Sequence, residues 1–189
     1  DLGPPQGRHS FALEAQLIPD PDRYGEVALN AMAFEPVVDG DVLPDLPIRR
    51  IAAGSARGVR VLTGANRDEQ RLFLVPNGVI DMITDEMLGP GAAAHGLDSA
   101  GLDAYRAARP GGTAGELICD ISTDWFFRIP SLRVAEAQAA LGTPSWVYDF
   151  TWPSPQFGGR LLACHALELG FTWDTIGLEA HGALSGQGA

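Results

Sequence analysis

A mixed α/β fold is the class that the sequence predicts, and three observations lead to it. Residues 59–63 and 145–150 are short runs, rich in β-branched or aromatic side chains and apolar on both faces, which is typical of strands inside a helix-covered parallel sheet. Longer stretches with helical character, 79–109 and 114–141, separate these two runs. Two strands are few for 189 residues, and such strands need neighbours, so the pattern favours part of a larger sheet.

Prolines divide the first quarter of the chain. Four of them interrupt residues 1–33, which we expect to be irregular. Three more lie in residues 34–48, around a Val-Asp-Gly-Asp turn, and this segment is expected to be extended with a turn. After the first strand, Asp68 is predicted to cap a short helix that carries Glu69.

The rest of the chain is predicted from helix and strand signals in turn. Residues 79–109 are expected to form helices in pieces, broken at Gly89-Pro90-Gly91. Residues 114–141 are expected to form one long helix, kinked or split at Pro130. The second strand and a loop rich in proline and glycine then lead into residues 160–171.

Composition excludes several classes of function. The net charge of −11 disfavours a nucleic-acid partner, because binding phosphates requires clustered basic side chains. No apolar run is long enough to span a bilayer, so no membrane partner is expected. The absence of lysine, with many alanines and glycines, points to a GC-rich bacterial genome. The chain opens on Asp1 rather than Met, so the location stays open between cytoplasmic and secreted.

The two cysteines, Cys119 and Cys164, have no companions at metal-ligand spacing, and we expect no metal site. Two buried free thiols are the favoured state, and a single disulfide is the alternative.

Two short motifs carry the candidate chemistry. Gly64–Glu69 follows the first strand and Cys164–Leu169 comes after the second. A serine hydrolase needs a histidine that takes the serine proton and an acid that holds this histidine in the correct tautomer. In α/β-hydrolases the acid and then the histidine follow the serine along the chain, at the carboxyl ends of strands. The order and placement of Glu69 and His165 therefore predict such an acid and base.

Five motifs run in one order between residues 34 and about 174, namely Phe34–Pro44, Gly64–Glu69 with Phe73, Asp124–Pro130, Val147–Phe150 and Cys164–Phe171. Together they resemble the type-B carboxylesterases, the family of para-nitrobenzyl esterases and cholinesterases. The resemblance implies an α/β-hydrolase fold with three layers, α/β/α. Residues 1–189 would form the C-terminal part of its single catalytic domain, lacking the N-terminal strands and the nucleophile elbow.

The resemblance also implies roles for individual residues. It makes Glu69 the acid of the triad and His165 the general base, and it makes Glu168 a carboxylate that supports the histidine. The positions that it places along the substrate pocket are Asn30, Met32, Leu72 and Phe73.

The nucleophilic serine is not in this sequence. No Gly-x-Ser-x-Gly motif occurs, and Leu97–Gly101 only imitates one, after Glu69 and without a preceding strand. We interpret it as a helix start, capped by Asp98 or Ser99. A carboxylic ester hydrolase that works through an acyl-serine, without metal or cofactor, is therefore expected only of the intact protein. The isolated chain is expected to be inactive.

Two kinds of partner follow from this interpretation, small carboxylic esters and the missing N-terminal half. The alternatives are a non-catalytic binding protein on the same scaffold and an inactive fragment that associates with itself through exposed strand edges.

Other side chains are expected to have structural roles. Asp124 is predicted to be a buried, hydrogen-bonded carboxylate. The side chains expected to pack a helix into the core are Trp125, Phe126 and Phe127. The histidines expected to be solvated are His9, His95 and His181.

Overall fold

The computed structural model describes Arg23 and residues 36–186, and the chain divides into two compact units, 1–47 and 48–189. In the first unit, the Asp39 carboxylate accepts hydrogen bonds from the backbone N–H groups of Asp41 and Leu43, both at 2.9 Å. The turn predicted within residues 34–48 is therefore present. Nearly all of residues 1–33 lie outside the described residues.

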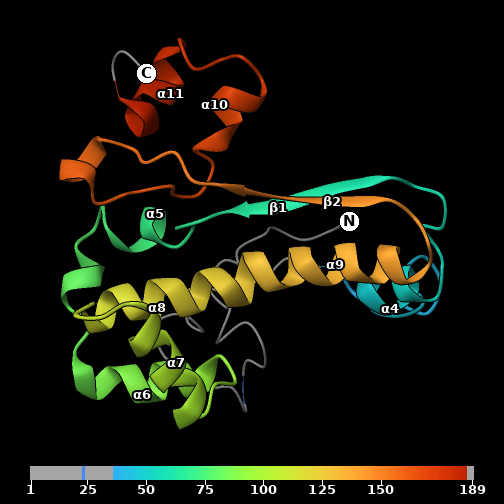
Figure 1. Cartoon of the computed structure of the whole chain (residues 1–189), viewed down its shortest axis with the longest axis horizontal. Helices are drawn as coiled ribbons and strands as arrows, with labels where there is room; N and C mark the ends of the chain where they lie inside the picture. The colour runs from blue at the N-terminus through green and yellow to red at the C-terminus, as the bar shows by residue number, and fades with distance from the viewer. Residues whose placement is uncertain (1–22, 24–35, 187–189) are drawn as a thin grey trace, which may run out of the picture. The chain divides into compact units, whose positions relative to one another are not determined.

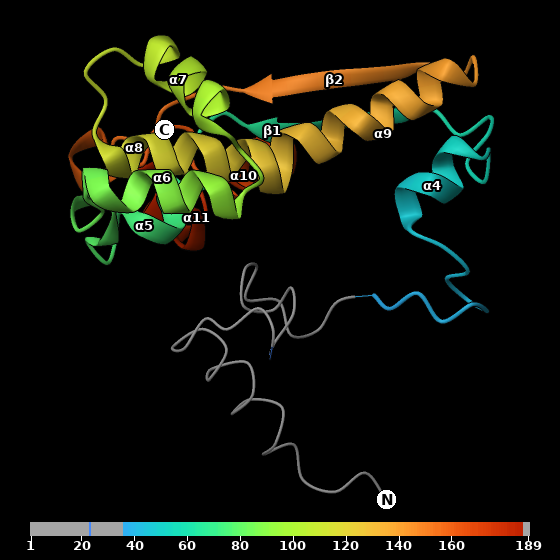
Figure 2. The same cartoon turned by 90° about the horizontal axis from the view of Figure 1, so that it is seen from below.

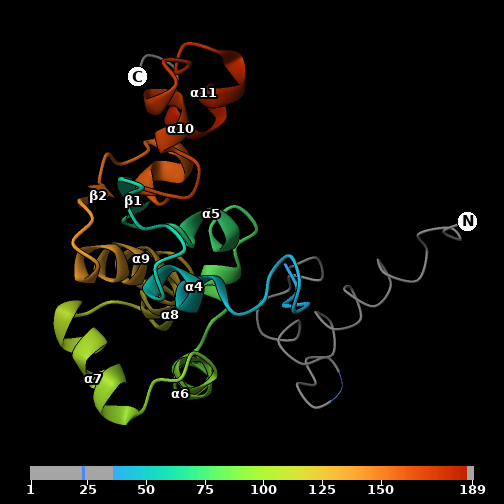
Figure 3. The same cartoon turned by 90° about the vertical axis from the view of Figure 1, so that its right-hand side faces the viewer.

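In chain order the described helices, turns and strands are α4 (Pro47–Ala52), β1 (Val61–Asn66), α5 (Arg71–Leu74), η1 (Val79–Asp81), α6 (Asp85–Ala94), α7 (Ser99–Ala108), α8 (Ala114–Thr123), η2 (Asp124–Arg128), α9 (Ile129–Ala140), β2 (Ser145–Phe150), η3 (Gln156–Gly159), α10 (Glu168–Thr172) and α11 (Glu179–Ser185). Figure 1 shows β1 and β2 side by side, with α9 running along them, and Figure 2 shows α9 beside the same strands from below. Helices α6 and α7 lie on the side of α8 that faces away from the strands (Figures 1 and 3). None of the described helices is long and apolar enough to cross a membrane.

The two predicted strands form a parallel pair. The register runs from Val61 opposite Ser145 to Asn66 opposite Phe150. β2 has its predicted bounds, whereas β1 begins and ends later than residues 59–63. Gly64 makes this register possible, because a Cβ atom there would lie 2.3 Å from the Tyr148 carbonyl oxygen. Position 64 is therefore restricted to glycine by the approach of β2.

Much of the apolar surface of the strands is exposed. Leu62 is 69% exposed on β1, and Trp146 and Val147 on β2 are 52% and 50% exposed. These are the side chains that a larger helix-covered sheet would bury. The part of the chain that the structure describes thus shows a mixed α/β arrangement with two parallel strands.

The long helical stretch is interrupted just before Pro130. η2 is a π-helical turn, in which the Ile129 N–H donates to the Asp124 carbonyl, five residues back. Pro130 has no N–H for the Phe126 carbonyl four residues earlier, so a regular α-helix could not be continued there. The predicted split is confirmed, and its form is a π-turn between α8 and α9.

The predicted break at Gly89-Pro90-Gly91 is wrong, because α6 runs through it. Leu88 and Ala92 on this helix are each 1% exposed and belong to a core cluster with α7 and α8. Burial of these side chains outweighs the weak local helix propensity. The break between helices lies instead near Gly96. At the start of α7 the Asp98 carboxylate accepts from the Gly101 N–H at 2.8 Å, which confirms the predicted cap.

A second core cluster lies beneath the segment that carries His165. Its buried members are Val75, Ile80, Cys119, Leu161, Cys164 and Leu167. Both cysteines are free and buried, so the favoured thiol state is confirmed. Burial raises the pKa of the Cys119 thiol to about 12 and that of the Cys164 thiol to about 11.

Candidate active site

Glu69 and His165 meet at the edge of the sheet where both strands end. Because β1 and β2 are parallel, their carboxyl ends lie at the same edge, and the segments that follow them come together. The Glu69 Oε2 atom lies 2.7 Å from His165 Nδ1. The His165 backbone N–H also donates to the Glu69 carbonyl oxygen at 3.3 Å. The two side chains singled out in the sequence therefore form one hydrogen-bonded pair.

Asp68 joins these two segments and does not cap a helix, so that prediction is wrong. α5 begins at Arg71, after an N-cap Gln70 whose side chain makes no capping bond. The Asp68 N–H donates to the Ala163 carbonyl at 2.9 Å, and the Asp68 carboxylate accepts from the Ala163 N–H at 3.2 Å. The carboxylate also lies 3.9 Å from the buried Arg71 guanidinium. These long-range partners take the place of the local capping bond.

Asn66, the last residue of β1, connects the acid to the histidine segment. Its backbone N–H donates to Glu69 Oε1 at 2.7 Å. Its side-chain Nδ2 donates to the Cys164 carbonyl at 2.7 Å and to the Glu168 carboxylate. Asn66 is only 1% exposed, and sequence reasoning gave it no role. The available signal was an amide side chain at the end of an apolar strand, where it would be buried and need partners.

Two aromatic rings lie beside the imidazole of His165. The centroid of Phe73 is 5.3 Å away and that of Phe127 is 5.2 Å away. The His165 side chain is 41% exposed, whereas that of Glu69 is only 7% exposed. The hydrogen bond to Glu69 raises the pKa of His165, and partial burial opposes this effect. The charge of Glu168 raises the pKa further, so Glu168 acts on the histidine through charge and through Asn66.

The contact with Glu69 determines which ring nitrogen is available. With Nδ1 donating to the carboxylate, the neutral imidazole carries its lone pair on Nε2. No residue within 36–186 is hydrogen-bonded to Nε2. Ala166, the next residue, has a φ of 65°, a left-handed value that is rare for a non-glycine residue and recurs at functional sites. The pair can therefore hold one tautomer and accept a proton at the exposed nitrogen.

The four predicted pocket residues have different surroundings. Phe73 is 46% exposed and lies beside the imidazole. Leu72 packs against the core cluster that contains Val75. Asn30 and Met32 lie outside the described residues.

Asp124 is hydrogen-bonded, as predicted, because it accepts from the Tyr105 hydroxyl at 2.6 Å and pairs with Arg128, but it is half-buried and not buried. The prediction for the aromatic triplet is wrong. Trp125 is 40% exposed, and Phe127 is directed to the imidazole of His165. The π-turn rotates these side chains away from the positions that a continuous α-helix would give them.

The prediction of solvated histidines is also wrong for the two that are described. His95 bonds through Nε2 to the Ser122 hydroxyl at 3.1 Å, and His181 bonds to the Thr175 hydroxyl at 3.0 Å. Both partners come from other segments brought close by the fold. His9 lies outside the described residues.

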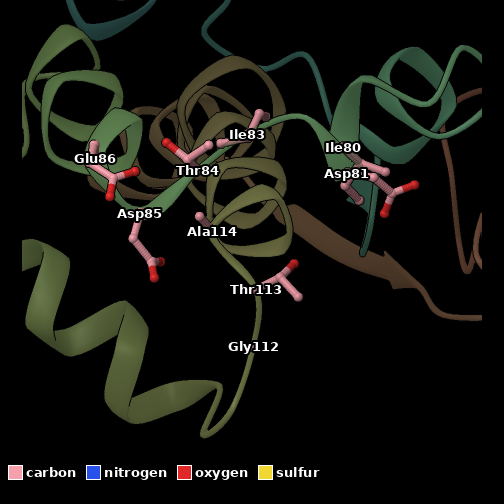
Figure 4. A pocket seen from close by; sticks show the side chains of 9 residues that line it. All are labelled: Ile80, Asp81, Ile83, Thr84, Asp85, Glu86, Gly112, Thr113 and Ala114. Atoms are coloured by element: carbon pink, nitrogen blue, oxygen red, sulfur yellow. The ribbon is translucent and has the colours of Figure 1, made fainter.

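A hollow of about 540 Å³ lies between the start of α6 and the start of α8 (Figure 4). Its lining includes the carboxylates of Asp81, Asp85 and Glu86, but neither Glu69 nor His165. The hollow is therefore separate from the acid–base pair. Among the described residues, no group of three or more histidine, cysteine, aspartate or glutamate side chains could hold a metal ion.

A hydrogen-bonded glutamate and histidine at the carboxyl ends of parallel strands are typical of the α/β-hydrolase class. The comparison with protein families agrees with this class. The model of the carboxylesterase family matches residues 15–183, and the chain belongs to this family.

The relatives are longer than this chain. It is 33% identical over 153 residues to the para-nitrobenzyl esterase of Bacillus subtilis (strain 168), a match that covers 77% of this chain and 29% of the relative. Among solved structures, the carboxylesterase EST55 of Geobacillus stearothermophilus at pH 6.2 matches with a TM-score of 0.69 and 25% identity, over 97% of this chain and 41% of that one. A structure of PNB esterase has the same fold over 89% of this chain and 38% of its own length, with a TM-score of 0.54 and 24% identity. The chain thus spans well under half of each relative.

Proposed function

We propose that Glu69 and His165 are the acid and the general base of a serine esterase whose nucleophile lies outside these 189 residues. The observation that carries this proposal is the 2.7 Å contact between Glu69 Oε2 and His165 Nδ1, in a chain of the carboxylesterase family. Residues 1–189 would form the C-terminal part of the single catalytic domain. The substrates would be small carboxylic esters.

The proposed chemistry uses the exposed nitrogen of the imidazole. His165 Nε2 takes the proton of the serine hydroxyl as the serine oxygen attacks the ester carbonyl carbon. The same nitrogen returns the proton to the leaving alcohol, and water then hydrolyses the acyl-serine by the same route. Glu69 holds Nδ1 as the donor and stabilises the imidazolium that forms. General-base catalysis of this kind contributes roughly 10²–10⁴-fold to the rate.

The exposed strands support a role for the missing half as partner. Leu62 on β1 and Trp146 and Val147 on β2 keep half or more of their surface exposed. Further strands at the open edges, together with helices packed on the faces of the enlarged sheet, would bury such side chains. We therefore expect the isolated chain to have no esterase activity. Self-association of the chain through the same edges would use the same exposed surface.

The test compares a longer parent protein with this chain. A parent that contains residues 1–189 is expected to gain one adduct with a fluorophosphonate and to hydrolyse a para-nitrophenyl ester, whereas the isolated chain does neither. In the parent, Glu69→Ala and His165→Ala are each expected to lower kcat by orders of magnitude. Glu136→Ala, which removes an exposed glutamate of α9, is the matched control and keeps the parental rate.

Two results would contradict the proposal. A near-normal kcat in either variant would show that the substituted residue, Glu69 or His165, has no catalytic role. A parent that never labels and never turns over an ester would instead favour a non-catalytic binding protein on this scaffold.

A further inference from the structure

The π-turn η2 connects α8 to α9 beside the acid–base pair. We propose that Thr123 to Arg128 is a positioning element that sets the geometry of Glu69 and His165, an inference that rests on the proposed function. The turn would hold the loop that carries the acid at two points and hold one face of the imidazole. Its residues would act through the pair and would not touch the substrate's reacting atoms.

Two hydrogen bonds hold the acid loop on either side of Glu69. The Arg128 guanidinium donates through Nη2 to the Arg67 carbonyl at 2.9 Å. The Thr123 hydroxyl, which is fully buried, accepts from the Gln70 N–H at 3.2 Å. The backbone is therefore attached to the helix just before and just after the acid.

The same turn reaches the base. The Phe127 ring lies 5.2 Å from the imidazole of His165, at an interplanar angle of 45°. Phe73 lies 5.3 Å away at 39°. An imidazole with two aromatic rings as neighbours has fewer orientations available, so Phe127 would limit rotation of the ring away from Glu69.

The π geometry explains how one turn can make these contacts. In a regular α-helix two residues five apart point roughly 140° away from each other. A π-turn closes its hydrogen bond after five residues, so it brings Thr123 and Arg128 toward the same side. The Ile129 N–H bond to the Asp124 carbonyl is this closure. Single π-turns inside α-helices are frequent at functional sites.

A second set of contacts holds the Arg128 side chain in place. Its guanidinium pairs with the Asp124 carboxylate, which also accepts from the Tyr105 hydroxyl of α7 at 2.6 Å. Burial and this carboxylate raise the pKa of Tyr105 well above its usual range, so the hydroxyl stays a donor at neutral pH. The chain of contacts thus runs from α7 through the turn to the Arg67 carbonyl.

The test measures the pKa of His165 by NMR in the 189-residue chain, in Arg128→Met and Asp124→Asn. We expect both variants to lower the pKa of His165 toward that of Glu69→Gln, because a loosened acid stabilises the imidazolium less. Loss of the Arg128 charge alone would act in the opposite direction, since removing a cation favours protonation of the histidine, whereas loss of the Asp124 charge alone would lower this pKa in the same direction. Arg106→Met, which removes a similar exposed pair with Asp103 on α7, is the control and leaves this pKa unchanged.

The outcomes separate this inference from the proposed function. If Glu69→Gln lowers the pKa of His165 but Arg128→Met and Asp124→Asn do not, the positioning role is wrong and the pair stands. If Glu69→Gln has no effect, the pair itself fails. Should Arg128→Met not fold, as judged by circular dichroism, Arg128→Gln, which also removes the cation, decides the question. In an active parent, Asp124→Asn is expected to lower kcat about tenfold or more with little change in KM.

Discussion

Removal of the Asn66 side chain is the perturbation that probes the site most directly. Asn66→Ala deletes both side-chain donors that connect β1 to the histidine segment, one to the Cys164 carbonyl and one to the Glu168 carboxylate. The backbone bond from position 66 to Glu69 Oε1 needs no side chain and is kept. The variant therefore separates the link between the segments from the local support of the acid.

The magnitude follows from the two lost bonds. A hydrogen bond between uncharged groups contributes about 1 kcal/mol net, and one to a charged group about 1.5–3 kcal/mol. The Glu168 carboxylate is half-buried and regains some water, which places it at the low end. Asn66→Ala should therefore lower the free energy of unfolding by about 2–3 kcal/mol. For a chain of this size that corresponds to a fall in Tm of roughly 5–10 °C.

Urea unfolding followed by tryptophan fluorescence measures this difference. Asn77→Ala is the matched control, because Asn77 is exposed and its amide makes only local bonds, donating to the Phe73 carbonyl at 3.1 Å and accepting from the Val79 N–H at 3.2 Å. We expect the control to lose less than about 1 kcal/mol, because both of its bonds are local and exposed. The reasoning is refuted if the two variants have the same urea midpoint at equal m-values.

Three further predictions concern packing, protonation and thiol reactivity. Gly64→Ala should destabilise the chain by about 1–3 kcal/mol or more, because the new Cβ would lie 2.3 Å from the backbone oxygen of Tyr148. The control Gly182→Ala should not destabilise the chain, because a Cβ at this position of α11 would have nothing within 4 Å. Equal urea midpoints for the two variants would contradict this prediction. The raised pKa of His165 stabilises the fold below about pH 6.5 and the effect is lost as pH rises through the folded value, so His165→Gln should cost more stability in urea titrations near pH 6 than near pH 9. Both cysteines should react with a thiol reagent only after unfolding, since burial raises their pKa values; labelling of the native chain within minutes would oppose this.

Strand and helix positions are predictable where local and tertiary preferences agree. β2 has its predicted bounds because its aromatic and β-branched side chains favour a strand in any context. The end of β1 could not be predicted, because Gly64 is extended only through its pairing with Tyr148. The course of α6 through Pro90 has the same origin, since burial of Leu88 and Ala92 against α8 outweighs the local signal.

The residues of the candidate site likewise divide into those that the sequence predicts and those that it does not. The order of the motifs along the chain and the family resemblance that they carry together predict that Glu69 and His165 form a pair, and the structure brings them into contact. The roles of Asn66 and Arg128 depend on contacts between segments distant in sequence and on the phase of a helix after a π-turn. Neither a contact between distant segments nor the phase of a helix leaves a local pattern in the sequence.

The contacts that hold the acid–base pair all lie within the part of the chain that carries two strands. The end of β1, the π-turn and the segment around His165 supply them, and no bond in this set requires a further strand. Leu62, Trp146 and Val147, which are half or more exposed, lie along β1 and β2. If the missing half adds its strands there, it would bring the serine to a pair that is already assembled. Its contribution to catalysis would then be the nucleophile and the oxyanion-binding N–H groups, and not the orientation of His165.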